Sequence, residues 1–307
     1  MSYSFSLSKL NFLLAVRKIP LRYKFQPNWC QNVSRALILK RSQFIPQSIS
    51  LLFTFPSIFS YKKANSINSS LSVIEQVDSA LRAGSYDKAV SDLRELLKDD
   101  AANFELVWRL SYACWCNARD KTLKSPEQLN LFEEALIYAQ KAYEMNPNHA
   151  AAHKMMGIAL TEANLGKREK LANSNRVYNH LKTACELNPD DPEAHYFYGS
   201  VCFVACVIPS TVKSIAGLFV SLPKSSFEEA LLHFSSAENL KPNFMCRNQF
   251  AMAKTYEMLG QFKEAHYWME KASRFEAHTV KDKKDRNDAI ETLNKWKTNK
   301  NFKLFFL

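Results

Sequence analysis

From about residue 71 onward, apolar residues fall into helix-length runs, and short polar turns that contain proline separate one run from the next. The stretch CELNPDDPEAHYFYG, residues 185–199, shows the pattern. Proline lacks the N–H that a helix must donate, so we predict that one helix ends before Pro189. Asp190 and Asp191 can cap the next helix, and Pro192 suits its first turn.

Small residues recur at matching distances from these turns. Alanine stands five residues before each of three prolines, and twelve before two of them, where it lets two helices approach closely. The residues expected to anchor the helix pairs are Gly84, Ala89, Ala135, Ala142, Pro147, Gly157, Ala184, Pro189, Gly199, Ala230, Ala237, Pro242, Gly260, Ala265 and Ala272. Repeated helix–turn–helix units predict an all-α helical-hairpin solenoid, in which no unit buries its apolar face alone.

These units resemble the tetratricopeptide repeat, with one departure. Pro147, Pro189 and Pro242 are 42 and 53 residues apart, whereas that repeat has a period of about 34 residues. The extra residues lie in 157–181 and 201–230, between the first and second helix of a unit. We therefore expect an irregular array, with lengthened helices or an added turn along one rim.

Composition supports the helical class, and charge divides the chain. Six glycines and 11 prolines are few for many short strands. Residues 1–74 hold ten Lys or Arg and no Asp or Glu, so they carry almost all of the net charge of +11. The rest is nearly neutral, which argues against a nucleic-acid-binding body. We place the array in residues 71–297, between a leader (1–70) and a basic, apolar tail (298–307).

The leader is free of acidic residues, rich in serine and bears arginines, which is typical of a mitochondrial transit peptide. A secretory signal is disfavoured because the apolar run NFLLAV is only six residues long. The run at 48–61 contains Pro56 and is too short to span a membrane as one helix. It suits a membrane interface, and a disordered leader with no later role is the alternative.

The array resembles one particular family, the regulators of microtubule dynamics. The stretches that carry the resemblance are FELVWRLSYAC (104–114), GKREKLANSNRVYNHLKTACELNPDDPEAHYFYGSVCF (166–203), SIAGLFVSLPKSSFEEALLHFSSAENLKP (214–242) and LGQFKEAHYWMEKA (259–272). The resemblance implies association with microtubules at spindle poles or in the cytoplasm, and for some members a mitochondrial location. A related member resembles a membrane tether whose helical domain holds phospholipid, but no clear single-helix anchor is evident here.

Candidate contact residues come from the array and the tail. Trp108, Arg109 and Tyr112 suit a binding groove or the core. Four tail lysines follow the last acidic residue, Glu291, and suit an acidic polymer or an anionic membrane, the latter helped by Phe302, Phe305 and Phe306. These lysines are Lys295, Lys297, Lys300 and Lys303. The alternative for this tail is a solvated helix end.

The apolar run SIAGLFVSL (214–222) has two interpretations. It packs back on the repeats as an inserted helix, or it lines a hydrophobic groove for lipid or a partner.

The sequence contains no motif typical of a catalytic site or a metal site. Seven cysteines include no C-x-x-C pair and suit core packing in a reducing compartment. His149 and His153 are four residues apart, but no third ligand is evident, and His195 is expected to pack in the first turn of its unit. We expect no catalytic residue, no metal and no cofactor.

The sequence thus predicts a non-catalytic scaffold that binds microtubules or associated proteins, at mitochondria or in the cytoplasm, including the cytoskeleton and spindle. The alternative is a membrane-contact tether or lipid-binding module that uses residues 214–222.

Overall fold

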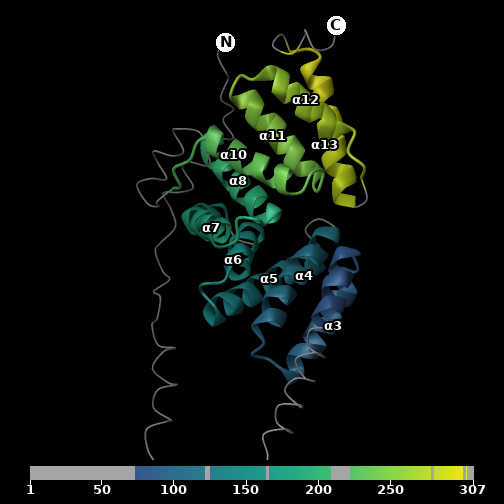
Figure 1. The fold of residues 1–307 in the computed structure, drawn as a ribbon, viewed down its shortest axis with the longest axis vertical. Coiled ribbons are helices and arrows are strands. Elements are labelled where there is room, and N and C mark those ends of the chain that lie inside the picture. The colour runs from purple at the N-terminus through teal and green to yellow at the C-terminus, as the bar shows by residue number, and fades with distance from the viewer. Residues whose placement is uncertain are drawn as a thin grey trace, which may run out of the picture. The chain divides into compact units, whose positions relative to one another are not determined.

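The structure is a computed structural model that describes residues 73–121, 125–163, 166–208, 222–277, 280–299 and 302. The leader and Lys300 and Lys303 lie outside these residues, as do residues 214–221 of the apolar run. Every regular element in the described part is a helix (Figure 1). Residues 73–82 are helical and precede α3 (Tyr86–Asp99), α4 (Phe104–Asp120), α5 (Pro126–Met145), α6 (Ala150–Glu162), α7 (Lys167–Leu187), α8 (Pro192–Val207), α10 (Phe227–Leu240), α11 (Cys246–Met258), α12 (Phe262–Ser273) and α13 (Val280–Trp296).

The helices form hairpins that pack on their sequence neighbours. The pairs α4 and α5, α6 and α7, α8 and α10, and α11 and α12 form the hairpins, and each hairpin contacts the next. The expectation of a tetratricopeptide-like array of helical hairpins is confirmed. In addition, α13 contacts α11, α12 and α4, so the last helix reaches a hairpin far from it in sequence.

The helix boundaries follow local chemistry. Helix α7 ends at Leu187, just before the Asn–Pro turn, and Pro192 opens α8. The Asp191 side chain caps α8, since it accepts hydrogen bonds from the backbone N–H groups of Glu193 and Ala194. Of the two residues predicted to cap this helix, Asp190 and Asp191, it is Asp191 that forms the cap. Helix α7, at 21 residues, contains part of the first insertion, so this insertion lengthens a helix.

The small residues lie where helices cross. Eight alanines on the second helices of the hairpins have exposed fractions of 0–1%, namely Ala89, Ala135, Ala142, Ala184, Ala230, Ala237, Ala265 and Ala272. Gly84, between the helical residues 73–82 and α3, and Gly260, between α11 and α12, have φ of +74°, a conformation that glycine adopts without strain. Gly157 lies inside α6 against Leu181 of α7, with no room for a side chain.

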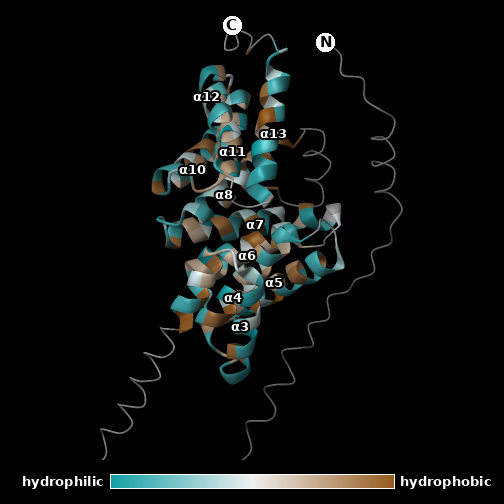
Figure 2. Cartoon of the chain, turned by 90° about the vertical axis from the view of Figure 1, so that its right-hand side faces the viewer, coloured by the Kyte–Doolittle hydropathy of each residue, from teal (hydrophilic) through white to brown (hydrophobic). Residues whose placement is uncertain are grey.

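Buried apolar residues form two clusters along the array. One extends from Val77 to Met252, and the other joins Cys246 and Ala253 of α11 to α12, α13 and Phe302. Figure 2 shows that the helices carry both hydrophobic and hydrophilic residues, as expected for helices that each bury one face.

Candidate functional site

The first helices of successive hairpins are joined by polar side chains. Tyr112 of α4 donates from its hydroxyl to Glu193 of α8 at 2.9 Å. Lys154 of α6 donates to Asp191 at 2.7 Å and to Glu193 at 3.3 Å. The Lys154 ammonium also lies 5.7 Å from the centre of the Tyr112 ring. This cluster ties three hairpins together.

The electrostatics of this cluster follow from burial and from the carboxylates. Burial and the Glu193 carboxylate raise the pKa of Tyr112 well above its ordinary value. Burial opposes the charge on Lys154, but Glu193 and Asp191 outweigh it and raise the Lys154 pKa. Both side chains therefore keep their protons across the physiological range.

Two of the candidate groove residues take part in a second set of contacts. Arg109 is 9% exposed and forms ion pairs with Asp78 at 2.8 Å and Glu105 at 2.5 Å. Its guanidinium lies 4.2 Å from the Trp108 ring, and the Trp108 indole N–H donates to Glu105. These contacts hold the helical residues 73–82 against α4, which is a structural use of Arg109.

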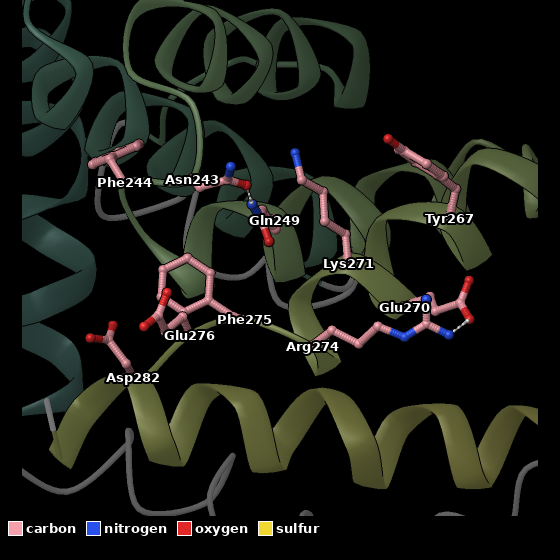
Figure 3. Close-up of a pocket in the computed structure, with 10 residues that line it drawn as sticks. All are labelled: Asn243, Phe244, Gln249, Tyr267, Glu270, Lys271, Arg274, Phe275, Glu276 and Asp282. Atoms are coloured by element: carbon pink, nitrogen blue, oxygen red, sulfur yellow. Dashed lines mark hydrogen bonds and ion pairs between the residues drawn. The ribbon is translucent and has the colours of Figure 1, made fainter. Parts of the chain in front are cut away.

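A pocket of about 570 Å³ lies where α11, α12 and the start of α13 meet (Figure 3). Part of its lining comes from the turn before α11, where Asn243 adopts φ of +56°, and part from residues 274–276, which follow α12. The pocket is lined by Asn243, Phe244, Gln249, Tyr267, Glu270, Lys271, Arg274, Phe275, Glu276 and Asp282.

A network of amides fixes one wall of the pocket. The Gln249 side-chain amide donates to Asn243 at 2.8 Å and to Glu238 at 3.1 Å. Lys271 also donates to Glu238, at 3.0 Å. Since Glu238 is only 5% exposed, these donors offset the cost of burying its charge. Within the described residues, the Gln249 Oε1 atom is buried and has no hydrogen-bond donor.

The opposite wall is open and charged. The side chain of Arg274 is 76% exposed and pairs with Glu270 at 2.5 Å. Tyr267 is 58% exposed. Figure 3 places Glu276 and Asp282 toward one end of the pocket and Arg274 and Tyr267 toward the other. The pocket therefore offers a cation and aromatic surface at the Arg274 end and two carboxylates, Glu276 and Asp282, at the other end.

At the C-terminal end, the sequence predicts four lysines with no acidic residue to pair with, and the structure differs at Lys295. Lys295 donates to Glu291 at 2.6 Å, one helical turn earlier. Lys297 is exposed, and Lys300 and Lys303 lie outside the described residues. Phe302 is fully buried and stacks on Trp296 with ring centres 3.9 Å apart. The idea that Phe302 helps a membrane contact is therefore wrong, because its ring belongs to the core.

The histidines form pairs that the sequence did not indicate. His149 caps α6, since its Nδ1 accepts from the Ala151 N–H at 3.2 Å. His153 instead faces His180 of α7, with the two Nδ1 atoms 3.1 Å apart. His195 faces His233 of α10 in the same way at 2.8 Å.

The two His pairs stand at the same sequence distances from a turn proline and from an anchor alanine. His153 and His195 each follow a turn proline by six residues. His180 and His233 each precede an anchor alanine by four residues. Burial and the partner imidazole lower the pKa of His180 and of His233 from 6.5 to about 4. His180 and His233 are thus neutral at physiological pH.

None of the described helices combines the length and the apolar character needed to cross a bilayer.

Comparisons with known proteins point to one family. The family described as "Regulator of microtubule dynamics protein 1-3" matches residues 73–297. Regulator of microtubule dynamics protein 1 of Pongo abelii is 34% identical over 224 residues, which cover 72% of this chain and 71% of that protein. The Bos taurus protein of that name is also 34% identical, with 72% and 70% covered.

A third relative and a solved structure match less closely. Regulator of microtubule dynamics protein 3 of Xenopus laevis is 24% identical over 235 residues, which cover 74% of this chain and 50% of that protein. A thermophilic TPR protein from Thermus thermophilus superimposes with a TM-score of 0.48 at 16% identity. That match covers 72% of this chain and 98% of the other.

Proposed function

The chain belongs to the family of regulators of microtubule dynamics 1–3, and on that premise we propose that its hairpins form a non-catalytic platform that binds microtubules or a microtubule-associated protein. The observation that carries the proposal is the match over residues 73–297, which coincides with the helical array. A rigid array suits this role because its contact residues are ordered before binding, which lowers the entropy cost of recognition.

We place the contact at the pocket between α11, α12 and α13. A microtubule presents an acidic surface, so the platform must offer an accessible cation. Arg274 fits, since its present partner Glu270 forms an exposed pair of about 0–1 kcal/mol, which a ligand carboxylate can replace at little cost. Phe275 and Tyr267 add aromatic surface beside it. Lys271 is less available, because it neutralises the buried Glu238.

The mitochondrial location remains a prediction. It rests on the acid-free composition of the leader, which lies outside the described residues.

The test is co-sedimentation of the full chain with taxol-stabilised microtubules at several salt concentrations. We expect the wild-type chain to pellet, and binding to weaken when protease treatment removes the acidic tails of tubulin. Arg274→Glu is expected to raise Kd about 10-fold, equivalent to about 1.4 kcal/mol.

The matched control is Lys182→Glu, a charge reversal of the same size at an exposed lysine of α7. It is expected to leave Kd unchanged. Failure of the wild-type chain to pellet at any salt concentration overturns the microtubule proposal. Equal binding by wild type and Arg274→Glu overturns the placement at this pocket.

A further inference from the structure

One side-chain cluster is independent of the binding pocket. Cys185 on α7, His195 on α8 and His233 on α10 each offer one ligand atom, and these atoms all lie within 4.8 Å of one another. Cys185 and His195 are buried, with exposed fractions of 7% and 8%. Thiolate and imidazole are the ligands that zinc takes in proteins. We propose that these three residues form a Zn²⁺ site that joins two successive hairpins.

The tautomer of His195 is already the one a metal requires. Its Nε2 lies 2.9 Å from the carbonyl oxygen of Pro189, which can only accept, so Nε2 carries the proton. The Nδ1 lone pair therefore points at His233. A metal-bound histidine commonly donates its second N–H to a backbone carbonyl, which fixes the ring and makes the ligand nitrogen more basic. The Asn–Pro turn before α8 supplies that carbonyl.

Zinc binding requires the side chains to adjust, because the Cys185 Sγ atom lies within 4.8 Å of both nitrogens and must come to about 3.6 Å from each, as Zn–S of about 2.3 Å and Zn–N of about 2.0–2.1 Å dictate. The His195 and His233 Nδ1 atoms are 2.8 Å apart, whereas two nitrogens on a tetrahedral zinc at about 2.0–2.1 Å lie about 3.3 Å apart. Side-chain torsions can supply this small increase in separation. His233 must move its proton from Nδ1 to Nε2 through solvent, so the imidazoles contribute no net proton change.

The thiol supplies the one proton that binding releases. Burial first, and then the nearby Asp191 carboxylate, raise the pKa of the Cys185 thiol to about 12, so it is protonated in the metal-free protein. Zn²⁺ replaces this proton, and the S–H bond is exchanged for a Zn–S bond. Water takes the fourth position, which makes a three-ligand site of Cys–His–His type.

The site has an access route. A pocket of about 440 Å³ opens beside His195 and Pro189, with Ser236, Asn239 and Leu240 on its other side. An ion can therefore reach the His195 side of the cluster without unfolding the hairpin.

The chain contains its own comparison cluster. His153 and His180 reproduce the second pair, and the His153 Nε2 atom again lies 2.8 Å from a proline carbonyl, that of Pro147. The position equivalent to Cys185, directly after the anchor alanine, is occupied by Tyr143, whose ring lies 5.2 Å from His153 and 5.0 Å from His180. A neutral tyrosine is a poor zinc ligand, so the proposal assigns the metal to the second cluster alone.

The experiment is a titration of the full chain, reduced and stripped with chelator, with Co²⁺ as a coloured substitute and then with Zn²⁺. We expect one equivalent of Co²⁺ to produce a near-ultraviolet thiolate charge-transfer band, and Zn²⁺ to remove it. Cys185→Ser should abolish the band. His233→Gln should weaken binding by more than about 100-fold, because loss of even an outer-shell partner costs about 10–100-fold.

Two variants of the first cluster complete the design. His180→Gln, at the position equivalent to His233, should leave the titration unchanged. Tyr143→Cys gives the first cluster the same three ligand types and should add a second equivalent. Circular dichroism verifies that each variant is folded, and the wild-type titration needs no variant. The proposal is overturned if the wild-type chain gives no saturable thiolate band, or if Cys185→Ser retains it.

Discussion

Gly157→Ala tests the close contact between α6 and α7. A Cβ atom at residue 157 would lie 2.5 Å from Cγ and 2.7 Å from Cδ2 of Leu181, whose side chain is fully buried. Carbon atoms in good contact are about 3.5–4.0 Å apart, so the overlap is about 1 Å. Cγ is the branch point of the leucine and moves only by rotation about the Cα–Cβ bond, which the buried surroundings of Leu181 oppose.

The magnitude follows from two opposing effects. Overpacking a tight core costs about 1–3 kcal/mol, and an overlap with a branch carbon belongs at the upper end. Alanine in a helix interior gains about 1 kcal/mol over glycine. We therefore expect Gly157→Ala to lower the free energy of unfolding by about 2 kcal/mol, measured by urea denaturation and far-ultraviolet circular dichroism.

A double-mutant cycle gives the sharper result. Leu181→Ala alone should cost about 2–5 kcal/mol, because it removes buried carbons and leaves a cavity. In the double variant, the new methyl group at residue 157 occupies part of that space, so the two losses should be less than additive by about 2 kcal/mol. Equal or greater stability of Gly157→Ala, or simple additivity with Leu181→Ala, would refute the proposed helix contact.

Three further predictions concern charge and the C-terminal core. Because the pKa values of His180 and His233 are lowered from 6.5 to about 4, the unfolded chain binds more protons between these values. Stability should fall as pH drops from about 6.5 to 4, and a variant with both histidines changed to Gln should show a flatter urea-midpoint profile. Arg247→Met leaves the buried Asp285 without the nearer of its two cations and should cost about 3 kcal/mol in urea unfolding; an unchanged midpoint would contradict this. Phe302→Ala removes a buried ring and should lower the local free energy of unfolding of the last turns of α13 by about 3 kcal/mol. Amide hydrogen exchange should become roughly 100-fold faster in these turns and stay unchanged in α3.

Local rules accounted for most of the fold. The proline turns and the Asp191 cap depend on neighbours in sequence, and the structure has both of them. The Glu291–Lys295 pair is also local, since residues four apart on a helix face each other. The sequence alone could therefore have predicted that Lys295 is paired with Glu291.

The candidate sites depend on contacts that no local rule supplies. The pocket forms between α11, α12 and α13, and its charge pattern requires knowing which side chains are already paired. The histidine pairs require the register between the two helices of a hairpin. Insertions of different length change that register, so the partners are 27 residues apart in the pair of His153 and His180 and 38 apart in the pair of His195 and His233.

The contact between α13 and α4 also affects how cooperatively the protein unfolds. Hairpins that touch only their neighbours can fray independently, from either terminus inward. Here α13 packs on α11 and α12 while it also reaches α4, so release of the last helix disturbs a hairpin near the start of the array. The contact between α13 and α4 links distant hairpins and favours a single cooperative unfolding transition over stepwise unfolding of one hairpin after another.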